Sequence, residues 1–369
     1  MVHVRHIVRQ FHPVIGGLED AVANLAVELA RQGIDGSIVT LNRAFGDPAT
    51  VLPRSANHRG ISITRIPYRG SSRYPIAPSV LQQLDGADIV HVHGIDFLFD
   101  FLALTRPLHR KPLVASTHGG FFHTSFASRA KRVFFHTATR VSARAYDRIF
   151  GSSESDAAMF SQIAPHTIMA LENGVNIEKW RDAASREAVP TMIFIGRFSV
   201  NKNIPALIAL VAALGPAWRL IIAGQPSDLS GEDLRDEAAR LGVADRVEVA
   251  TGADDATLHA LVGRASYVAS ASRYEGFGLS VVEGMSAGLT PILNNIAPFQ
   301  RLVAASGCGL IVDMDDTAGT ARAAQAQHDA RMPDARYANI AAVQVYSWTG
   351  VAAKFAIEYS AVLAARAAT

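Results

Sequence analysis

Residues 267–288 of the chain read YVASASRYEGFGLSVVEGMSAG. The run 267–269 is short and apolar, as is typical of a buried strand, and a glycine-rich loop with Glu275 follows it. The loop leads into an apolar, small-residue stretch around Glu283 that is typical of a helix. A strand, a loop and a helix in this order form one unit of a parallel α/β sheet.

The same alternation extends along the chain in both directions and predicts an α/β protein with two Rossmann-like halves. The predicted strands are residues 2–9, 36–41, 87–93, 113–117, 148–152, 192–196, 220–223, 247–250, 267–269 and 291–293, and the chain turns at Asn173-Gly174 between the two series. We place the division after residue 170 and interpret the polar stretch 178–190 as the linker. Trp348 opens a last helical stretch, residues 350–365.

The composition predicts a globular chain. Apolar residues make up 49% and charged residues 18%, which excludes a disordered protein. No stretch approaches the roughly 20 uncharged apolar residues that span a bilayer. The start, residues 2–9, is too basic for a secretory signal, and a single cysteine, Cys308, cannot form an internal disulfide. We therefore expect a cytoplasmic protein.

The net charge of +2 is unevenly distributed along the sequence. Residues 1–170 carry 18 basic and 12 acidic side chains, whereas residues 171–369 carry 17 and 21. A basic first half can face anionic lipid, a lipid diphosphate or nucleic acid, and a chance imbalance on a solvated surface is equally compatible. Residues 123–148 mix aromatic and basic side chains, which indicates either a membrane-surface segment or an amphipathic core helix.

Two loops that follow predicted strands can hold a diphosphate. Gly16 and Gly17 precede a helix, where an anion can approach the backbone N–H groups, although such a turn is often only structural. Arg197 and Lys202 follow the strand 192–196. The guanidinium binds two oxygens at once and the ammonium acts as a point charge, so this pair can stabilise a diphosphate leaving group without a metal. Two unrelated surface cations are the alternative.

The loop and helix of residues 275–283 can hold the sugar and the ribose. The Glu275 carboxylate can accept hydrogen bonds from sugar hydroxyls, and Glu283, two helical turns on, can accept both ribose hydroxyls. The backbone N–H groups that can face phosphate or sugar oxygens are those of Phe277, Gly278 and Leu279. A capped helix with an incidental acid is the alternative.

Metal ligands are sparse in the sequence. Asp313-Met314-Asp315 has a spacing used for metal-bound sugar nucleotides, but it follows the last predicted strand, so we expect a surface turn. His91 and His93 share one strand face without a carboxylate partner, which favours buried or substrate-facing histidines over zinc ligands. We predict that the protein needs no cofactor or metal and keeps full activity in a chelator.

Four motifs, in this order along the chain, resemble those of glycosyltransferase family 4, the retaining enzymes of the two-domain GT-B fold. They are Gly16-Gly17, Glu172-Asn173-Gly174-Val175, Gly196-Arg197 with Lys202, and residues 275–283. Residues 11–13, 69–79 and 116–124 are similar to blocks of the family's α-mannosyltransferases that use GDP-mannose and a polyprenyl-diphosphate-linked cellobiosyl acceptor in exopolysaccharide assembly.

The resemblance implies an arrangement of the whole chain. Residues 1–170, joined by a C-terminal helix 350–369 that crosses back to them, would bind the acceptor, and residues 171–349 would bind the nucleotide sugar across a cleft. It also implies a peripheral location on the inner face of the cytoplasmic membrane, reached through the basic N-terminal domain. No nucleic-acid partner is expected.

The resemblance also implies roles for single residues. The expected catalytic residues are His118, which would lie beside the reacting face of the sugar, Arg197, Lys202 and Glu275. The expected donor-binding residues are Gly16, Gly17, Glu172, Asn173, Arg197, Lys202, Asp254 (for guanine, with Asp255 as the alternative), Glu275, Phe277, Gly278, Leu279 and Glu283. Tyr74 and His123 are expected to bind the acceptor.

Other functions remain compatible with these motifs. They are a related retaining transferase with UDP-glucose or another acceptor, a nucleotide-sugar epimerase, and a non-catalytic nucleotide-sugar-binding protein. No side chain stands out as a covalent nucleophile. We therefore expect departure and attack on one face of the sugar, with the leaving phosphate taking the acceptor proton.

Overall fold

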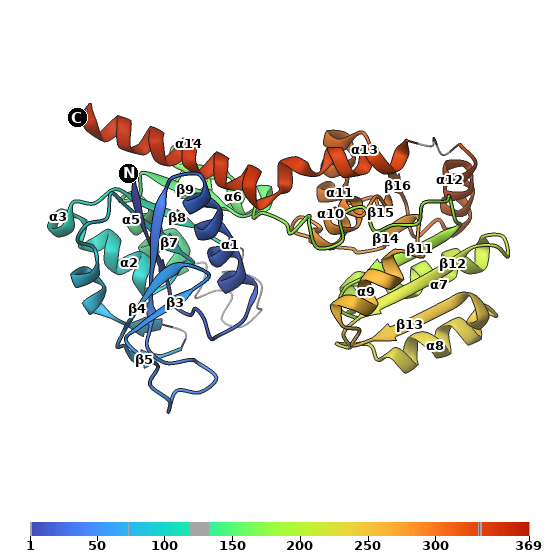
Figure 1. Cartoon of the computed structure of the whole chain (residues 1–369), viewed down its shortest axis with the longest axis horizontal. Coiled ribbons are helices and arrows are strands. Elements are labelled where there is room, and N and C mark those ends of the chain that lie inside the picture. Colours follow the sequence, from blue (N-terminus) through green and yellow to red (C-terminus); the bar gives the residue numbers. More distant parts are fainter. Residues whose placement is uncertain (1, 73, 119–132, 331, 333, 369) are drawn as a thin grey trace. The chain divides into compact units, whose positions relative to one another are not determined.

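The computed structural model describes residues 2–72, 74–118, 133–330, 332 and 334–368. The chain divides into two compact units, residues 1–174 with 348–369 and residues 175–347 (Figure 1). Within the described residues, no helix has the length and apolar character that crossing a membrane requires.

Unit 1 is built on a sheet with the order β10-β9-β8-β7-β1-β2-β4-β3, parallel except for the pair β3 and β4. Its strands are β1 (His3–Val8), β2 (Asp35–Leu41), β3 (Ser55–His58), β4 (Ile61–Ile66), β7 (Ile89–His93), β8 (Leu113–Ser116), β9 (Arg148–Gly151) and β10 (Ile168–Ala170). A separate hairpin consists of β5 (Arg69–Ser71) and β6 (Tyr74–Ile76). The helices are α1 (Gly17–Arg31), α2 (Phe97–Leu104), α3 (Arg106–His109), α5 (Arg140–Ala143), α6 (Glu154–Phe160) and α14 (Trp348–Ala367).

The predicted strands of unit 1 are confirmed to within a few residues, but the edge of the sheet was missed. β3 is a polar edge strand with no buried residue, so it lacks the apolar run that identifies a strand in sequence. β4 does alternate between buried and more exposed positions over most of its length. The hairpin strands have three residues each, too few for a periodicity.

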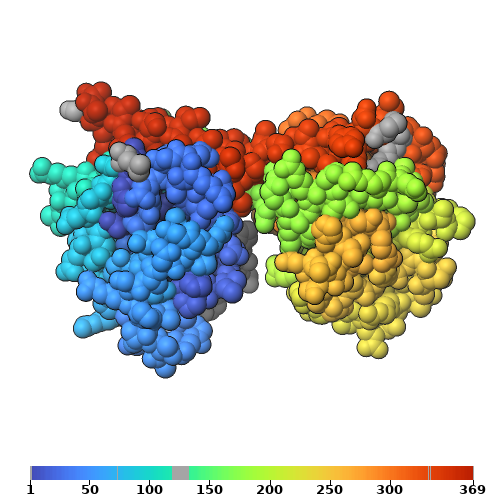
Figure 2. Space-filling view, in the orientation of Figure 1, coloured from blue at the N-terminus to red at the C-terminus, as the bar shows by residue number. Residues whose placement is uncertain are grey.

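The C-terminal helix α14 packs on unit 1, as the resemblance implied. Its apolar face joins residues of α1, β1, β7, β8 and β9 in one cluster: Val4, Leu25, Leu29, Ile89, Val114, Phe150, Val351, Phe355, Tyr359 and Val362. Position 174, the last residue of the first part of unit 1, must be glycine. A Cβ there would overlap the ring of Trp348, where the chain re-enters the same unit. In the space-filling view the red atoms of this helix lie against blue N-terminal segments of the same unit (Figure 2).

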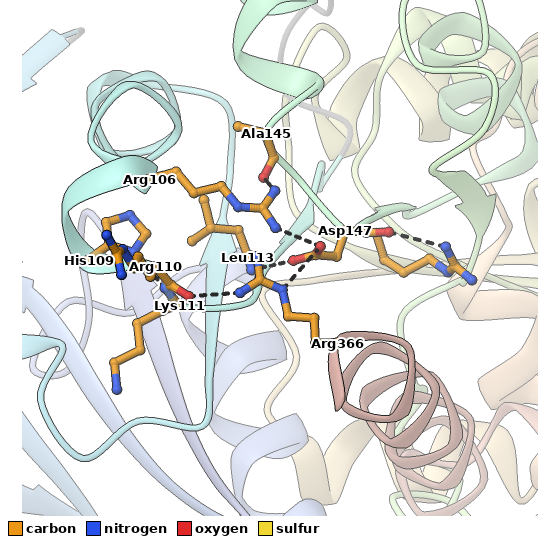
Figure 3. Close-up of polar contacts among 9 residues, drawn as sticks. Arg106, His109, Arg110, Lys111, Leu113, Ala145, Asp147 and Arg366 are labelled. Atoms are coloured by element: carbon orange, nitrogen blue, oxygen red, sulfur yellow. Dashed lines mark hydrogen bonds and ion pairs between the residues drawn. The ribbon is translucent and has the colours of Figure 1, made fainter. Parts of the chain in front are cut away.

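The far end of α14 is held by polar contacts around Asp147, just before β9 (Figure 3). The Asp147 carboxylate accepts hydrogen bonds from Arg106 Nη2 at 2.7 Å and from the backbone N of Leu113 at 2.9 Å. Arg366 Nε lies 3.6 Å from the same carboxylate, and its Nη1 donates to the carbonyl of Arg110 at 2.7 Å. The last turn of α14 is thus tied to α3.

Unit 2 contains a six-stranded parallel sheet with the order β13-β12-β11-β14-β15-β16. Its strands are β11 (Thr191–Ile195), β12 (Arg219–Gly224), β13 (Val247–Thr251), β14 (Tyr267–Ser270), β15 (Thr290–Asn294) and β16 (Leu310–Val312). Its helices are α7 (Ile204–Ala213), α8 (Gly231–Arg240), α9 (Asp255–Val262), α10 (Leu279–Ser286), α11 (Ala297–Ser306), α12 (Thr317–Asp329) and α13 (Ala335–Ala342). The five predicted strands are confirmed, and the short β16 was not predicted.

The interpretation of residues 178–190 as a linker is wrong. Trp180 is 2% exposed and packs with Ile177 and Ala184 in the core of unit 2. Backbone hydrogen bonds join the segment to the end of α10, from Asp182 N to Ser286 O and from Ala184 N to Ala287 O. In sequence, charged residues flank Trp180 and make the stretch look exposed. The free energy gained by burying the large Trp180 ring nevertheless holds the segment against the core.

Candidate active site

Both sheets have one point where the strand order reverses, between β1 and β7 in unit 1 and between β11 and β14 in unit 2. Ligands of open α/β sheets bind beyond the carboxyl ends of the strands at such points. Gly16 and Gly17 follow β1, Arg197 and Lys202 follow β11, and Glu275 follows β14. The predicted site residues therefore lie at the position in each unit where a ligand is expected.

The loop after β11 is held in place around Arg197. Gly224 must be glycine, because a Cβ there would overlap the carbonyl oxygen of Gly196. Phe198 is fully buried, and its backbone N donates to the carbonyl of Gln225 at 2.8 Å. The Arg197 side chain is exposed and makes no hydrogen bond or ion pair with the residues that the structure describes. A fixed backbone thus presents a guanidinium that is free for a ligand.

Lys202 and Glu275, 73 residues apart in sequence, form an ion pair through Lys202 Nζ and Glu275 Oε1. Ser272 Oγ donates to the same oxygen at 2.9 Å. The two loops are also joined by hydrogen bonds from Asn201 Nδ2 to the carbonyl of Tyr274 at 2.8 Å and from Arg273 N to the carbonyl of Asn201 at 2.9 Å. No described residue hydrogen-bonds to Glu275 Oε2, so this oxygen is available to a sugar hydroxyl.

Gly278 is the residue immediately before the first residue of helix α10, and its φ is +94°. Only glycine adopts this left-handed conformation readily, and a Cβ would also come within 2.8 Å of Phe299 Cε1. Gly278 has no side chain that could cap the first turn, which leaves N–H groups at the helix start for an anionic or polar ligand.

Glu283 lies in the second turn of α10 and is half-buried. Burial raises the pKa of its carboxyl, and the nearby Lys179 ammonium partly offsets this effect. Lys179 is shared, because its Nζ also lies 3.1 Å from Asp255 Oδ1. The predicted role of Glu283 toward a ribose remains a prediction.

In unit 1, the start of α1 carries an acid of its own. Gly16 precedes the helix, and Glu19 folds back so that its Oε2 would lie 2.5 Å from a Cβ on Gly16. Burial raises the pKa of Glu19. A diphosphate at Gly16 and Gly17 would meet this carboxylate, so donor binding there requires Glu19 to turn away or to be protonated.

His118 follows β8 with the left-handed φ of +51°. Its Nε2 lies 3.0 Å from Nδ1 of His93 on β7, and His93 Nε2 lies 2.9 Å from Nδ1 of His6 on β1. Burial lowers the pKa of His118 to about 4, so the ring is neutral at neutral pH. His6 was missed in the sequence, because only the register of β1 with β7 places it beside His91 and His93.

Comparison with known proteins gives the family. The family profile described as "Glycosyltransferase Family 4" matches residues 15–179, and the profile "Glycosyl transferases group 1" matches residues 176–339. The chain is 49% identical, over 98% of its length and 97% of the relative, to the GDP-mannose:cellobiosyl-diphosphopolyprenol alpha-mannosyltransferase of Xanthomonas campestris. The chain belongs to the family 4 glycosyltransferases. It is therefore an enzyme that transfers a sugar.

Further relatives agree with this assignment. The glycosyltransferase is 46% identical, over 96% of both chains, to the protein of the same name from Xanthomonas oryzae pv. oryzae. Its fold is similar to that of sucrose-phosphate synthase from Thermosynechococcus elongatus, with a TM-score of 0.69 and 19% identity over 99% of this chain and 100% of the other. The prediction of the GT-B fold class is confirmed.

Five other predicted site residues of the glycosyltransferase remain untested. Asp254 caps α9, its Oδ1 accepting from Thr257 N at 2.8 Å, and these hydrogen bonds lower the pKa of Asp254. The Tyr74 hydroxyl donates to Asp100 Oδ2 at 3.1 Å. Glu172 and Asn173 are half-buried at the end of the N-terminal part of unit 1. His123, and with it most of the block 116–124, lies outside the described residues.

Ligand atoms of His6, His91 and His93 lie within 4.8 Å of one another, close enough to surround an ion. However, both ring nitrogens of His91 and of His93 are engaged in hydrogen bonds to side chains, with which a metal would have to compete. Asp313 and Asp315 are exposed in the turn after β16, where Asp315 N donates to Asp313 Oδ1 at 3.0 Å. The expected surface turn is confirmed.

Proposed function

We propose that this glycosyltransferase transfers α-mannose from GDP-mannose to a polyprenyl-diphosphate-linked cellobiosyl acceptor, with retention, in exopolysaccharide assembly. The observation that carries the proposal is the identity of 46–49% over almost the whole chain with relatives of that name. The charges of the site support it.

Cleavage of the bond between the sugar and the diphosphate places negative charge on the leaving group, which prearranged cations stabilise. Arg197 is free for this role, and Lys202 lies beside Glu275, the predicted sugar-binding carboxylate. The side chains of Lys202 and Glu275 are 20% and 16% exposed, so both charges act in a partly desolvated environment. Glu275 is held by Lys202 and Ser272, which favours a binding role over that of a nucleophile.

To test this proposal, the enzyme is incubated with a cellobiosyl-diphosphate lipid and either GDP-mannose or UDP-glucose. The mass and the linkage of the product are then determined. Transfer of mannose from GDP-mannose, inhibited by GDP more strongly than by UDP and unaffected by a chelator, is expected. Transfer from UDP-glucose, or conversion of the sugar nucleotide without lipid, would exclude the proposal.

A substitution of Glu275 tests whether the reaction takes place at this site. Glu275→Gln keeps the size of the side chain but removes the charge that pairs with Lys202. We expect a loss of about 100- to 1000-fold in kcat, the range found when one preorganised polar group is removed from an active site. Glu232→Gln, at an exposed position in α8, is the matched control and should transfer at the normal rate.

We further propose that unit 1 binds the inner face of the cytoplasmic membrane through the surface of α2, α3 and α5. Leu104 and Leu108 are 79% and 77% exposed, and Arg110 beside them is also exposed. α5 lies next to α2, because Ser142 Oγ donates to Asp100 Oδ1 at 2.7 Å, and it carries the exposed pair Arg140 and Val141. Exposed apolar side chains among cations suit an anionic lipid surface.

The two readings of residues 123–148 can be compared over the part that is described. Phe135, Thr139 and Ala143 are buried at helical spacing, whereas Val133 and Val141 are 64% and 66% exposed. The segment therefore has a core face and also an exposed face with apolar side chains. This combination supports membrane contact without making it the only role of the helix.

Sedimentation with anionic vesicles tests the membrane proposal. The double variant Leu104→Ser/Leu108→Ser should bind vesicles several-fold more weakly, because each substitution removes apolar surface that the membrane would bury. Val345→Ser, at a 54% exposed position in unit 2, is the matched control. Equal binding of all variants, or no binding of the native enzyme, would exclude this surface.

A further inference from the structure

Four histidines are buried or half-buried side by side in unit 1, and three of them form a chain of hydrogen bonds. His6 Nδ1 lies 2.9 Å from His93 Nε2, and His93 Nδ1 lies 3.0 Å from His118 Nε2. His91 stands beside this chain and is bonded elsewhere, to the Tyr359 hydroxyl at 2.6 Å and to Ser116 Oγ at 2.8 Å. The three-ring chain ends at His118, the residue expected beside the sugar.

All three rings are neutral at neutral pH. Burial lowers the pKa of His6 to about 3 and that of His118 to about 4, and it lowers the pKa of His93 well below its ordinary value. A neutral imidazole donates through one nitrogen and accepts through the other. The two bonds of the chain must therefore point the same way, and only two arrangements satisfy both.

The two arrangements differ at the ends of the chain. His6 Nε2 and His118 Nδ1 are both buried and have no hydrogen-bond partner among the described residues. If the N–H groups point from His6 toward His118, His6 ends in a lone pair and His118 Nδ1 carries a proton. If they point the other way, the N–H without a partner lies at His6.

Two observations favour the first arrangement. His6 is 0% exposed on a central strand, so neither water nor a ligand can accept from an N–H there. His118 is half-buried at a strand end, so a smaller movement brings its buried Nδ1 into reach of a ligand. The Asp156 carboxylate is held by hydrogen bonds from Thr117 at 2.7 Å and Ser152 at 2.8 Å. Its negative charge stabilises a proton on His118, which favours the arrangement in which His118 Nδ1 carries the N–H.

We propose that His6 and His93 are positioning residues that hold His118 as its Nδ1–H tautomer, so that His118 donates a hydrogen bond to the transferred sugar. The bond made by one ring nitrogen sets the tautomer of the other, and here that bond is relayed over two rings. The second part of the proposal rests on the proposed function and on the expected position of His118 beside the transferred sugar. A donor at this position binds a sugar oxygen and cannot act as a base.

The tautomer is measured directly by long-range proton–nitrogen NMR correlation of the full chain labelled with 15N at histidine. Signals are assigned with His6→Asn, His93→Asn and His118→Asn variants. The expected spectrum has protonated Nδ1 and unprotonated Nε2 for His118, His93 and His6 at neutral pH. An Nε2–H tautomer of His118 in the native enzyme would overturn the proposal, whichever donor sugar the enzyme uses.

Kinetics test the consequence for transfer. His6→Leu removes the first donor, so we expect a mixture of His118 tautomers and a decrease in kcat of about tenfold, with the donor KM changed less than about twofold. His6→Asn can donate through its amide and should restore both. Tyr359→Phe, which removes a buried bond of His91 outside the chain, should leave the tautomer and kcat unchanged. A His6→Leu enzyme with mixed tautomers and native kcat would contradict the role in transfer.

Discussion

At the scale of the residue, a substitution of Arg197 should affect ligand binding without affecting stability, because its side chain is exposed and has no polar contact with the described residues. Arg197→Ala should therefore change the free energy of unfolding by no more than about 0.5 kcal/mol. It should raise the donor KM by roughly 10- to 100-fold, since it removes charge-assisted hydrogen bonds to the diphosphate. Arg301→Ala, at an exposed position of α11, is the control for both measurements. An unchanged KM would remove Arg197 from the donor site.

The burial of the Glu283 carboxyl predicts that the stability of the protein depends on pH. Burial raises the pKa of its carboxyl in the folded state above the unfolded value, so its stabilising contribution is fully present below the unfolded pKa. The contribution is lost as pH rises through the folded pKa. In urea unfolding, the stability of the native enzyme relative to Glu283→Gln should therefore decrease from pH 4 to pH 7. A difference that grows over this range would contradict the burial of the charge.

At the scale of the element, Gly278 determines where α10 begins. Gly278→Ala has to adopt a left-handed φ and displace Phe299, whereas Gly252→Ala has a similar positive φ of +68° but open space. The first substitution should reduce the free energy of unfolding by about 1–3 kcal/mol more than the second. Donor turnover should fall only in Gly278→Ala. Equal effects in urea unfolding and in turnover would show that the contact with Phe299 is unimportant.

Helix α14 offers a matched pair of large apolar residues. Phe355 is 3% exposed and packs against Phe150 with ring centroids 4.9 Å apart, whereas Ile357 is 67% exposed. Phe355→Ala should destabilise unit 1 by about 3–5 kcal/mol, the usual range for an aromatic ring removed from a core. Ile357→Ala should change stability by less than about 0.5 kcal/mol. Urea unfolding followed by circular dichroism measures both, and similar losses would refute the packing of α14.

At the scale of the whole molecule, the two units have separate hydrophobic cores, and each buried cluster draws its residues from one unit only. We expect calorimetry to resolve two unfolding transitions. Phe355→Ala should lower the temperature of one of them, and GDP at 100 times its Kd should stabilise the other by about 2.7 kcal/mol. A single transition that moves with both changes would contradict independent cores.

Much of the fold was predictable from local patterns. Ten predicted strands correspond to β1, β2, β7–β9 and β11–β15 within a few residues, because buried parallel strands are continuous apolar runs that can be recognised one at a time. The polar edge strand β3 and the buried Trp180 were mispredicted for the same reason. In both, the neighbours in space decide burial, and those neighbours are distant in sequence.

The sequence by itself determined which loops carry the charges and glycines of the site, since a loop that follows a strand must emerge at the carboxyl edge of the sheet. Only the tertiary structure decided what those groups touch. Lys202 meets Glu275 across 73 residues, and Glu19 turns back toward Gly16. The register of β1 with β7 places His6 opposite His91, within hydrogen-bonding reach of the His93 ring. Hydrogen bonds and ion pairs act over about 3–4 Å, a distance that strand order and register set and that no local pattern records.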